Sequence, residues 1–169
     1  EYAWAKDSID LLHQRNIIQG DDKGFFYPAE NTRRGDFVLM LNRAFGFSTE
    51  VDGNFEDVAE DAYYFEGIGV AKKLGVLSEK ENLFYPENFI TREEIMVMLL
   101  RAFVASGKDI ELAREDILKQ YDDSENISNY ARPAVAALVK CGVINGANGR
   151  IAPKQYATRA EIIVILHRA

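Results

Sequence analysis

The sequence has few of the residues that form disulfides or hold metals. Its 169 residues include one cysteine, Cys141, and two histidines, His13 and His167. One cysteine excludes an internal disulfide and a cysteine zinc site, and two histidines argue against a histidine metal site. We therefore expect no metal and no cofactor, and we expect Cys141 to be a small buried side chain near a helix end.

Long apolar runs and an excess of basic charge are also missing. The longest apolar run, Ile95 to Leu100, is far shorter than the roughly 20 residues that cross a bilayer. No signal peptide pattern opens the chain. The net charge of −7, from 27 acidic and 20 basic residues, argues against nucleic acid as a main partner, because such proteins present a basic face. We expect a soluble mature or excised piece without membrane insertion.

An internal repeat fills the chain instead. Pro28, Pro86 and Pro153 each stand six residues before an arginine. We assign the repeats to residues 1–54, 55–103 and 121–169, and we expect the first to begin inside its motif. The insertion at 104–120 carries spaced apolar residues, which predict one extra short helix. Those residues are Ile110, Ala113 and Ile117.

Each repeat predicts two helices separated by a turn-rich loop. The first helix has one apolar stripe, formed by Ala5/Ile9/Leu12, Tyr64/Ile68/Ala71 and Ala131/Val135/Leu138. It ends near Asn16, Gly75 or Gly142, residues that tolerate a left-handed cap. The second helix is apolar all round at 37–41, 95–100 and 162–166, so it must be covered on most sides. We predict an all-α, pseudo-threefold trimer of helix-loop-helix repeats around a central three-helix bundle.

The second helices begin with a recurring pattern. Thr91 with Glu94, and Thr158 with Glu161, have capping-box spacing, and Asp36 stands at the acid's place in the first repeat. An arginine recurs in the first turn, where the helix dipole disfavours a cation. Two interpretations remain open: the arginines bind an anion, or they pair with an acid of a neighbouring repeat. They are Arg34, Arg92 and Arg159.

The repeat resembles the S-layer homology (SLH) family over essentially its whole length. The signature of that family is three tandem motifs that each end in a Thr-Arg-Ala-Glu-like tetrapeptide. Residues 158–161 match it in full, 91–94 differ at one place, and 33–36 read Arg-Arg-Gly-Asp. The family's Gly-Ile-Ile-x-Gly-like stretch is found at 16–20 and 142–146, whereas Glu79 replaces its last glycine in the second repeat. Residues 55–58 match the family's opening Phe-x-Asp-Val.

The resemblance implies a non-catalytic module of a larger bacterial surface protein, located at the cell wall. It implies binding of a pyruvylated secondary cell wall polysaccharide, associated with peptidoglycan, in grooves between neighbouring motifs. The motif arginines and Gly20 and Gly146 would contribute, and Arg33 could hold a second charge. The third repeat has the complete motif and six basic against four acidic residues over 121–169, so Arg159 is the strongest candidate.

An aromatic residue stands at one aligned position in the three repeats, as Trp4, Tyr63 and Tyr130. These side chains could offer a flat face to a sugar ring. The interpretation we favour is core packing at the start of the first helix.

Three other functions make different demands on the sequence. A glycosidase needs only two carboxylates, but no nucleophile with a neighbouring base stands out. Residues 21–24, Asp-Asp-Lys-Gly, lack the alternating ligands of a calcium loop, and a β-turn is the simpler account. A protein-interaction or lattice-forming module without a glycan ligand remains the alternative to polysaccharide binding.

Overall fold

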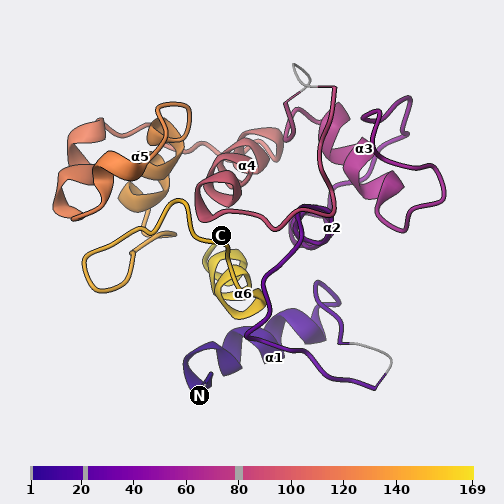
Figure 1. Ribbon diagram of the computed structural model, residues 1–169, viewed down its shortest axis with the longest axis horizontal. Coiled ribbons are helices and arrows are strands. Elements are labelled where there is room, and N and C mark those ends of the chain that lie inside the picture. The colour runs from indigo at the N-terminus through magenta and orange to yellow at the C-terminus, as the bar shows by residue number, and fades with distance from the viewer. Residues whose placement is uncertain (1, 21–22, 79–81) are drawn as a thin grey trace. The chain divides into compact units, whose positions relative to one another are not determined.

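The computed structural model of the chain describes residues 2–20, 23–78 and 82–169 (Figure 1). It confirms the all-α prediction. In the described residues no helix is both long and apolar enough to span a membrane. The helices are α1 (Lys6–Gln14), α2 (Arg34–Phe45), α3 (Phe65–Lys73), α4 (Arg92–Ala105), α5 (Arg132–Lys140) and α6 (Arg159–Arg168), with short 3-10 helices η1 (Ala3–Ala5), η2 (Glu115–Gln120) and η3 (Ser124–Asn126).

The chain forms two compact units that do not follow the repeat boundaries. The first unit is Glu1–Ile90 with Ala157–Ala169, and the second is Thr91–Tyr156. In the first unit α2 packs on α3 and α6 packs on α1; in the second, α4 packs on α5 (Figure 1). The second helix of every repeat therefore packs on the first helix of the next repeat, and the third repeat pairs with the first.

Burial follows the sequence pattern closely. The stripes of the first helices are buried at Leu12, Ile68, Ala71, Val135 and Leu138. The second helices are buried on most sides, as their uniform apolar character requires. Their buried side chains are Phe37, Val38, Met40, Leu41, Ile95, Met96, Met98, Leu99, Ile162, Ile163, Ile165 and Leu166. The expected left-handed caps are present, with φ of 56° at Asn16, 74° at Gly75 and 77° at Gly142.

A closed ring of backbone hydrogen bonds joins the three repeats inside the first unit. Thr32 N–H donates to Ala157 O at 3.0 Å, Ala157 N–H to Ile90 O at 3.1 Å, and Ile90 N–H to Thr32 O at 3.0 Å. Each of these residues immediately precedes the N-cap of a second helix. The ring and the contact of α2 with α6 agree with threefold organisation in this unit, and the bundle of all three second helices stays a prediction.

One local prediction needs correction. Cys141 is exposed rather than buried, because α5 ends at Lys140 and Cys141 is its C-cap residue. The insertion contains one short helix, as expected. This is the 3-10 helix Glu115–Gln120, anchored by the fully buried Leu118, whereas residues 108–114 are irregular.

We expect Thr32→Val to stabilise the protein by about 1 kcal/mol. Thr32 is 1% exposed and its Oγ1 has no hydrogen-bond partner among the described residues. Burying an unpaired hydroxyl costs free energy that valine, of the same shape, avoids. Urea unfolding of both proteins measures the difference. The matched control is Thr158→Val, which removes a capping hydroxyl and should destabilise by about 1 kcal/mol. A lower stability for Thr32→Val would contradict the assignment.

Candidate functional site: the three junctions between repeats

The start of each second helix lies against the proline-containing loop of the next repeat. We call these loops, residues 26–30, 84–88 and 151–155, the Pro loops. The first junction joins the start of α2 to 84–88, the second joins the start of α4 to 151–155, and the third joins the start of α6 to 26–30. The first and third junctions lie in the first unit and the second junction lies in the second unit.

Three donors bind three loop carbonyls at every junction. At the third junction, Arg159 Nε donates to Phe26 O at 2.9 Å and Arg159 N–H to Glu30 O at 2.8 Å. The next amide, of Ala160, donates to Pro28 O at 3.1 Å. We call this set of bonds the clasp. At the first junction, Arg34 Nε donates to Phe84 O, Arg34 N–H to Asn88 O and Gly35 N–H to Pro86 O. At the second junction, Arg92 Nε donates to Ile151 O, Arg92 N–H to Gln155 O and Glu93 N–H to Pro153 O.

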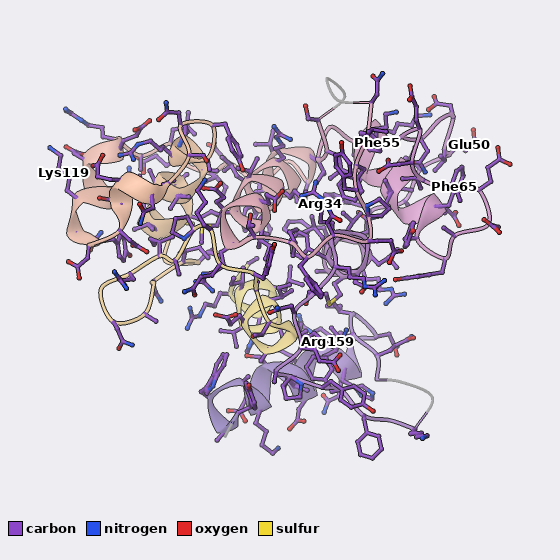
Figure 2. All side chains as sticks on the ribbon, viewed as in Figure 1. Arg34, Glu50, Phe55, Phe65, Lys119 and Arg159 are labelled. Atoms are coloured by element: carbon purple, nitrogen blue, oxygen red, sulfur yellow. The ribbon has the colours of Figure 1, made fainter. Side chains whose placement is uncertain are left out.

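The clasp gives the arginines a structural role in addition to the two roles that the sequence left open. Their Nε atoms bind neutral backbone carbonyls of the next repeat. The first two helix amides, which no intrahelical carbonyl can satisfy, are bound by the same loop and are closed to a ligand. What remains for an anion is the guanidinium charge, which carbonyls do not neutralise. Arg159 is half-buried, Figure 2 shows it at the start of α6, and it makes no ion pair with any described residue.

Aromatic rings and one further carbonyl hold the guanidinium groups in place. The Cζ atoms of Arg34 and Arg159 each lie 4.6 Å from the ring centroid of a loop phenylalanine, Phe84 and Phe26 respectively. These are cation–π contacts. Ile151 stands at the equivalent place in the Pro loop of the second junction. Arg159 Nη2 also donates to Gln19 O at 3.2 Å.

Two aspartates that the sequence did not single out fix the Pro loops. Asp57 accepts hydrogen bonds from the amides of Phe84 at 2.8 Å and Tyr85 at 2.6 Å. Asp123, which is 7% exposed, accepts from the aligned amides of Ile151 at 2.9 Å and Ala152 at 2.8 Å. A signal for both was present, because each is an aspartate near the start of its repeat, 27 to 29 residues before the amides it binds.

These loops are strained at one repeated position. The residue before the proline is left-handed in all three, with φ of 53° at Tyr27, 57° at Tyr85 and 56° at Ala152. Non-glycine residues adopt this conformation at a cost of order 1–3 kcal/mol, and it persists where the surroundings hold it. The aspartate carboxylates provide that hold in the second and third repeats.

The helix caps differ between the repeats. Thr91 and Thr158 form full capping boxes, in which their amides donate to Glu94 and Glu161, both at 2.8 Å. At the first junction the N-cap is Arg33, whose side chain makes no cap hydrogen bond. Arg33 forms an ion pair with Glu87 of the Pro loop. Asp36, expected as a cap, accepts a hydrogen bond from Tyr63 Oη at 2.7 Å instead.

The interpretation of the aligned aromatic residues as core packing is wrong. Trp4 is 56% exposed, Tyr63 67% and Tyr130 61%. They stand where the first helix of one repeat meets the start of the second helix of the preceding repeat. Tyr130 Oη donates to Glu93 at 3.1 Å, and Trp4 lies in η1, which packs on α6. Their exposed faces adjoin the junctions, and sugar binding by them stays a prediction.

The two candidate glycines allow close approach of backbone segments. A Cβ at Gly20 would lie 2.9 Å from Gly24 C, and one at Gly146 would lie 2.6 Å from Arg150 O. Gly146 also has a φ of 67°. Gly20 follows Gln19, whose carbonyl binds Arg159, so this loop does reach the third junction. Glu79, and Asp21 and Asp22 of the expected turn, lie outside the described residues.

A pocket of about 310 Å³ brings two of the candidate arginines together. Arg33 and Arg159 both line it, in the first unit, with Asn31, Phe89 and the acids Glu30 and Asp36. Arg34 and Arg92 are not among its lining residues. The pocket therefore offers a guanidinium group for an anion, and carboxylates and an amide for hydroxyl donors, beside an exposed aromatic ring.

The second junction contains a buried carboxylate. Glu93 is 3% exposed and accepts hydrogen bonds from Lys154 Nζ at 2.6 Å, Ser128 Oγ at 2.9 Å, Ser128 N–H at 3.1 Å and Tyr130 Oη at 3.1 Å. Burial alone would raise the pKa of Glu93. The hydrogen bonds from Lys154, Ser128 and Tyr130 outweigh it and hold this pKa below its ordinary value.

Comparison with known proteins agrees with this repeated architecture. The model of the S-layer homology domain matches residues 1–38, 54–96 and 120–163. The chain is 32% identical to an exoglucanase of Acetivibrio thermocellus and 34% identical to an amylopullulanase of Thermoanaerobacterium thermosulfurigenes, each over 97% of its length. It is 29% identical, over 98%, to a surface-layer 125 kDa protein of Lysinibacillus sphaericus. It spans only 15%, 9% and 14% of those proteins.

The chain belongs to the S-layer homology domain family. The three matched segments correspond to the three repeats, and each includes the arginine of a clasp. Family membership and the surface-layer relatives place the chain at the cell surface, in association with the cell wall, and support a role in surface anchoring. The finer repeat boundaries stay predictions.

Asp123→Ala should destabilise the protein by about 2 kcal/mol. The substitution leaves the buried amide of Ile151 and the partly buried amide of Ala152 without an acceptor. Urea denaturation followed by circular dichroism measures the loss. Asp122→Ala is the matched control, because Asp122 is the exposed neighbour, and we expect a change within about 0.5 kcal/mol. Equal effects of the two substitutions would contradict the loop-fixing role of Asp123.

Glu93 should make the free energy of unfolding depend on pH in the acid range. Its folded pKa lies below the ordinary 4.5, so its carboxylate contributes stability above about pH 4.5, and this contribution is lost as pH falls through the folded pKa. Glu93→Gln should remove this part of the pH dependence, measured as unfolding free energy between pH 3 and 7. Glu125→Gln, at an exposed position, serves as control. A profile for Glu93→Gln parallel to the wild type would refute the assignment.

Proposed function

We propose that this chain anchors a larger surface protein non-covalently to the cell wall by binding an anionic, pyruvylated wall polysaccharide at the third junction. The ligand carboxylate binds the guanidinium group of Arg159, and sugar hydroxyls bind the polar groups of the adjoining pocket. The observation that carries the proposal is a half-buried cation held by neutral carbonyls, at the edge of a pocket with further polar side chains.

Electrostatics favour this junction over the other two. The body as a whole is acidic, at −7, so an anion must be held by local charge. At the first junction Arg33 pairs with Glu87, and at the second Lys154 pairs with Glu93. At the third junction no described acid pairs with Arg159. Hydrogen bonds from its charged guanidinium group to a ligand carboxylate are stronger than hydrogen bonds between neutral groups.

The relatives favour attachment over catalysis or lattice formation. An exoglucanase, an amylopullulanase and a surface-layer protein share this segment, and it is at most 15% of each of the three. These three proteins have no single reaction or assembly in common by name, so the shared segment fits a task that all three need. Wall attachment by a non-catalytic module is such a task.

The test measures, by calorimetry, the affinity of three single-substitution variants for a pyruvylated wall disaccharide. Arg159→Gln keeps a donor on the side chain but loses the charge, and we expect affinity to fall at least tenfold. Arg159→Lys keeps the charge and should fall less. Arg168→Gln makes the same charge change about 14 Å further along the same helix, at an exposed position, and should bind like the wild type.

The ligand can be varied as well. Removing the pyruvyl group, and with it the carboxylate, should abolish binding to the wild type. Equal affinity for the stripped disaccharide, or equal affinity of Arg159→Gln with unchanged helical content, would reject the proposal. Binding that requires a second protein rather than the glycan would favour an interaction or lattice module.

A further inference from the structure

The second junction already holds a carboxylate, supplied by the chain itself. Glu93 Oε1 accepts hydrogen bonds from Lys154 Nζ, Ser128 Oγ and Tyr130 Oη, and Oε2 accepts from Ser128 N–H. The side chain of Glu93 is 4% exposed, whereas that of Lys154 is 55% exposed. The carboxylate is thus enclosed, and the ammonium group that binds it remains open to water on one side.

The four donors form a complete receptor for a carboxylate group. One backbone amide, one hydroxyl, one phenol and one ammonium group converge on its two oxygens, a donor set that satisfies the acceptor capacity of an ionised carboxylate. They come from two segments, the turn that precedes α5 and the Pro loop. Asp123 also binds that loop, at the amides of Ile151 and Ala152. The loop backbone is therefore held in place even without Glu93.

The equivalent positions carry no carboxylate in the other repeats. The residue after the clasp arginine is Gly35 in the first repeat and Ala160 in the third. At Gly35 an added Cβ would lie 3.0 Å from the Tyr64 ring, and Ala160 is fully buried. The backbone amide of this residue makes the same clasp bond in all three repeats. The acidic side chain of Glu93 is therefore an addition to the clasp and not a part of it.

We propose that Glu93 is an internal occupant of a carboxylate-binding site formed by Ser128, Tyr130 and Lys154, and that it closes the second junction to anionic ligands. A small carboxylate binds this receptor when the Glu93 side chain is removed. Together with the proposed function, on which this last step rests, the occupancy of the second junction leaves the third junction as the site for the anionic saccharide.

Chemical rescue of Glu93→Ala by acetate tests the receptor without any glycan. The substitution removes a CH₂–COO⁻ group, which has the size of acetate. The variant leaves the amide and hydroxyl of Ser128 and the ammonium of Lys154 without their acceptor, so it should be less stable than the wild type. Sodium acetate should then raise its Tm, by about 3–6 °C at ten times the dissociation constant and further with the logarithm of its concentration. The wild type in acetate, and the variant in sodium chloride of equal ionic strength, should show no such rise.

A double variant provides the matched control. Glu93→Ala with Lys154→Met removes both charges of the pair, so it should fold and should not respond to acetate. If Glu93→Ala alone fails to fold, acetate should restore its helical circular dichroism by mass action. A Glu93→Ala protein, folded or unfolded, that acetate does not affect, or an equal response of the double variant, overturns the proposal.

The glycan experiment separates this proposal from the proposed function. In calorimetry, the wild type should bind one pyruvylated disaccharide, and Lys154→Met should leave that affinity unchanged. Two equivalent sites in the wild type would overturn the occupancy of the second junction while supporting anchoring. Absence of any disaccharide binding, with acetate rescue of Glu93→Ala intact, would refute the proposed function and leave the receptor standing.

Discussion

The structure depends on where the free amides at the start of each second helix find their acceptors. An α-helix leaves its first amides without intrahelical partners, and these helices are buried, so water cannot serve. The carbonyls of the next repeat's Pro loop accept them, and the arginine side chain adds a third bond to the same loop. One repeat alone lacks both the acceptors and the packing surface. This is why the compact units cut across the repeats rather than between them.

The same bonds determine which part of each junction can meet a ligand. A helix start is a common anion site because its amides are open, but here the loop occupies the first two amides. The charge of the guanidinium group is not cancelled by carbonyl acceptors, so the arginine stabilises the fold and remains a cation. The proposed function favours the junction where no described acid forms an ion pair with the clasp arginine, as at Arg159. At the first and second junctions the neighbouring cations Arg33 and Lys154 are each paired with an acid of the chain, Glu87 and Glu93.

Periodicity and cap chemistry predicted the helices well. The apolar stripes, the uniformly apolar second helices and the left-handed residues at Asn16, Gly75 and Gly142 all follow from local rules, and the structure has them. The partner of each helix could not be predicted, since the pattern of a buried face does not say which repeat covers it. Cys141 is exposed at the C-cap of α5, one residue past the end of the helix, and sequence alone places a helix end only to within a few residues. The exposed aromatic residues were misjudged because aromatic character at a helix start fits a core or a surface equally well.

A clasp built on backbone acceptors leaves side chains free to diverge. The loop carbonyls and the helix amides are the same in all three junctions, whatever residue follows the arginine. Glycine, glutamate and alanine occupy that position, and alanine, glutamate and lysine occupy the position after the loop proline. The backbone atoms of these segments therefore hold the repeats together, whereas their side chains determine whether a junction can bind a ligand. A repeat protein of this kind can lose or gain a binding site through one side chain without losing the bonds that hold its repeats together.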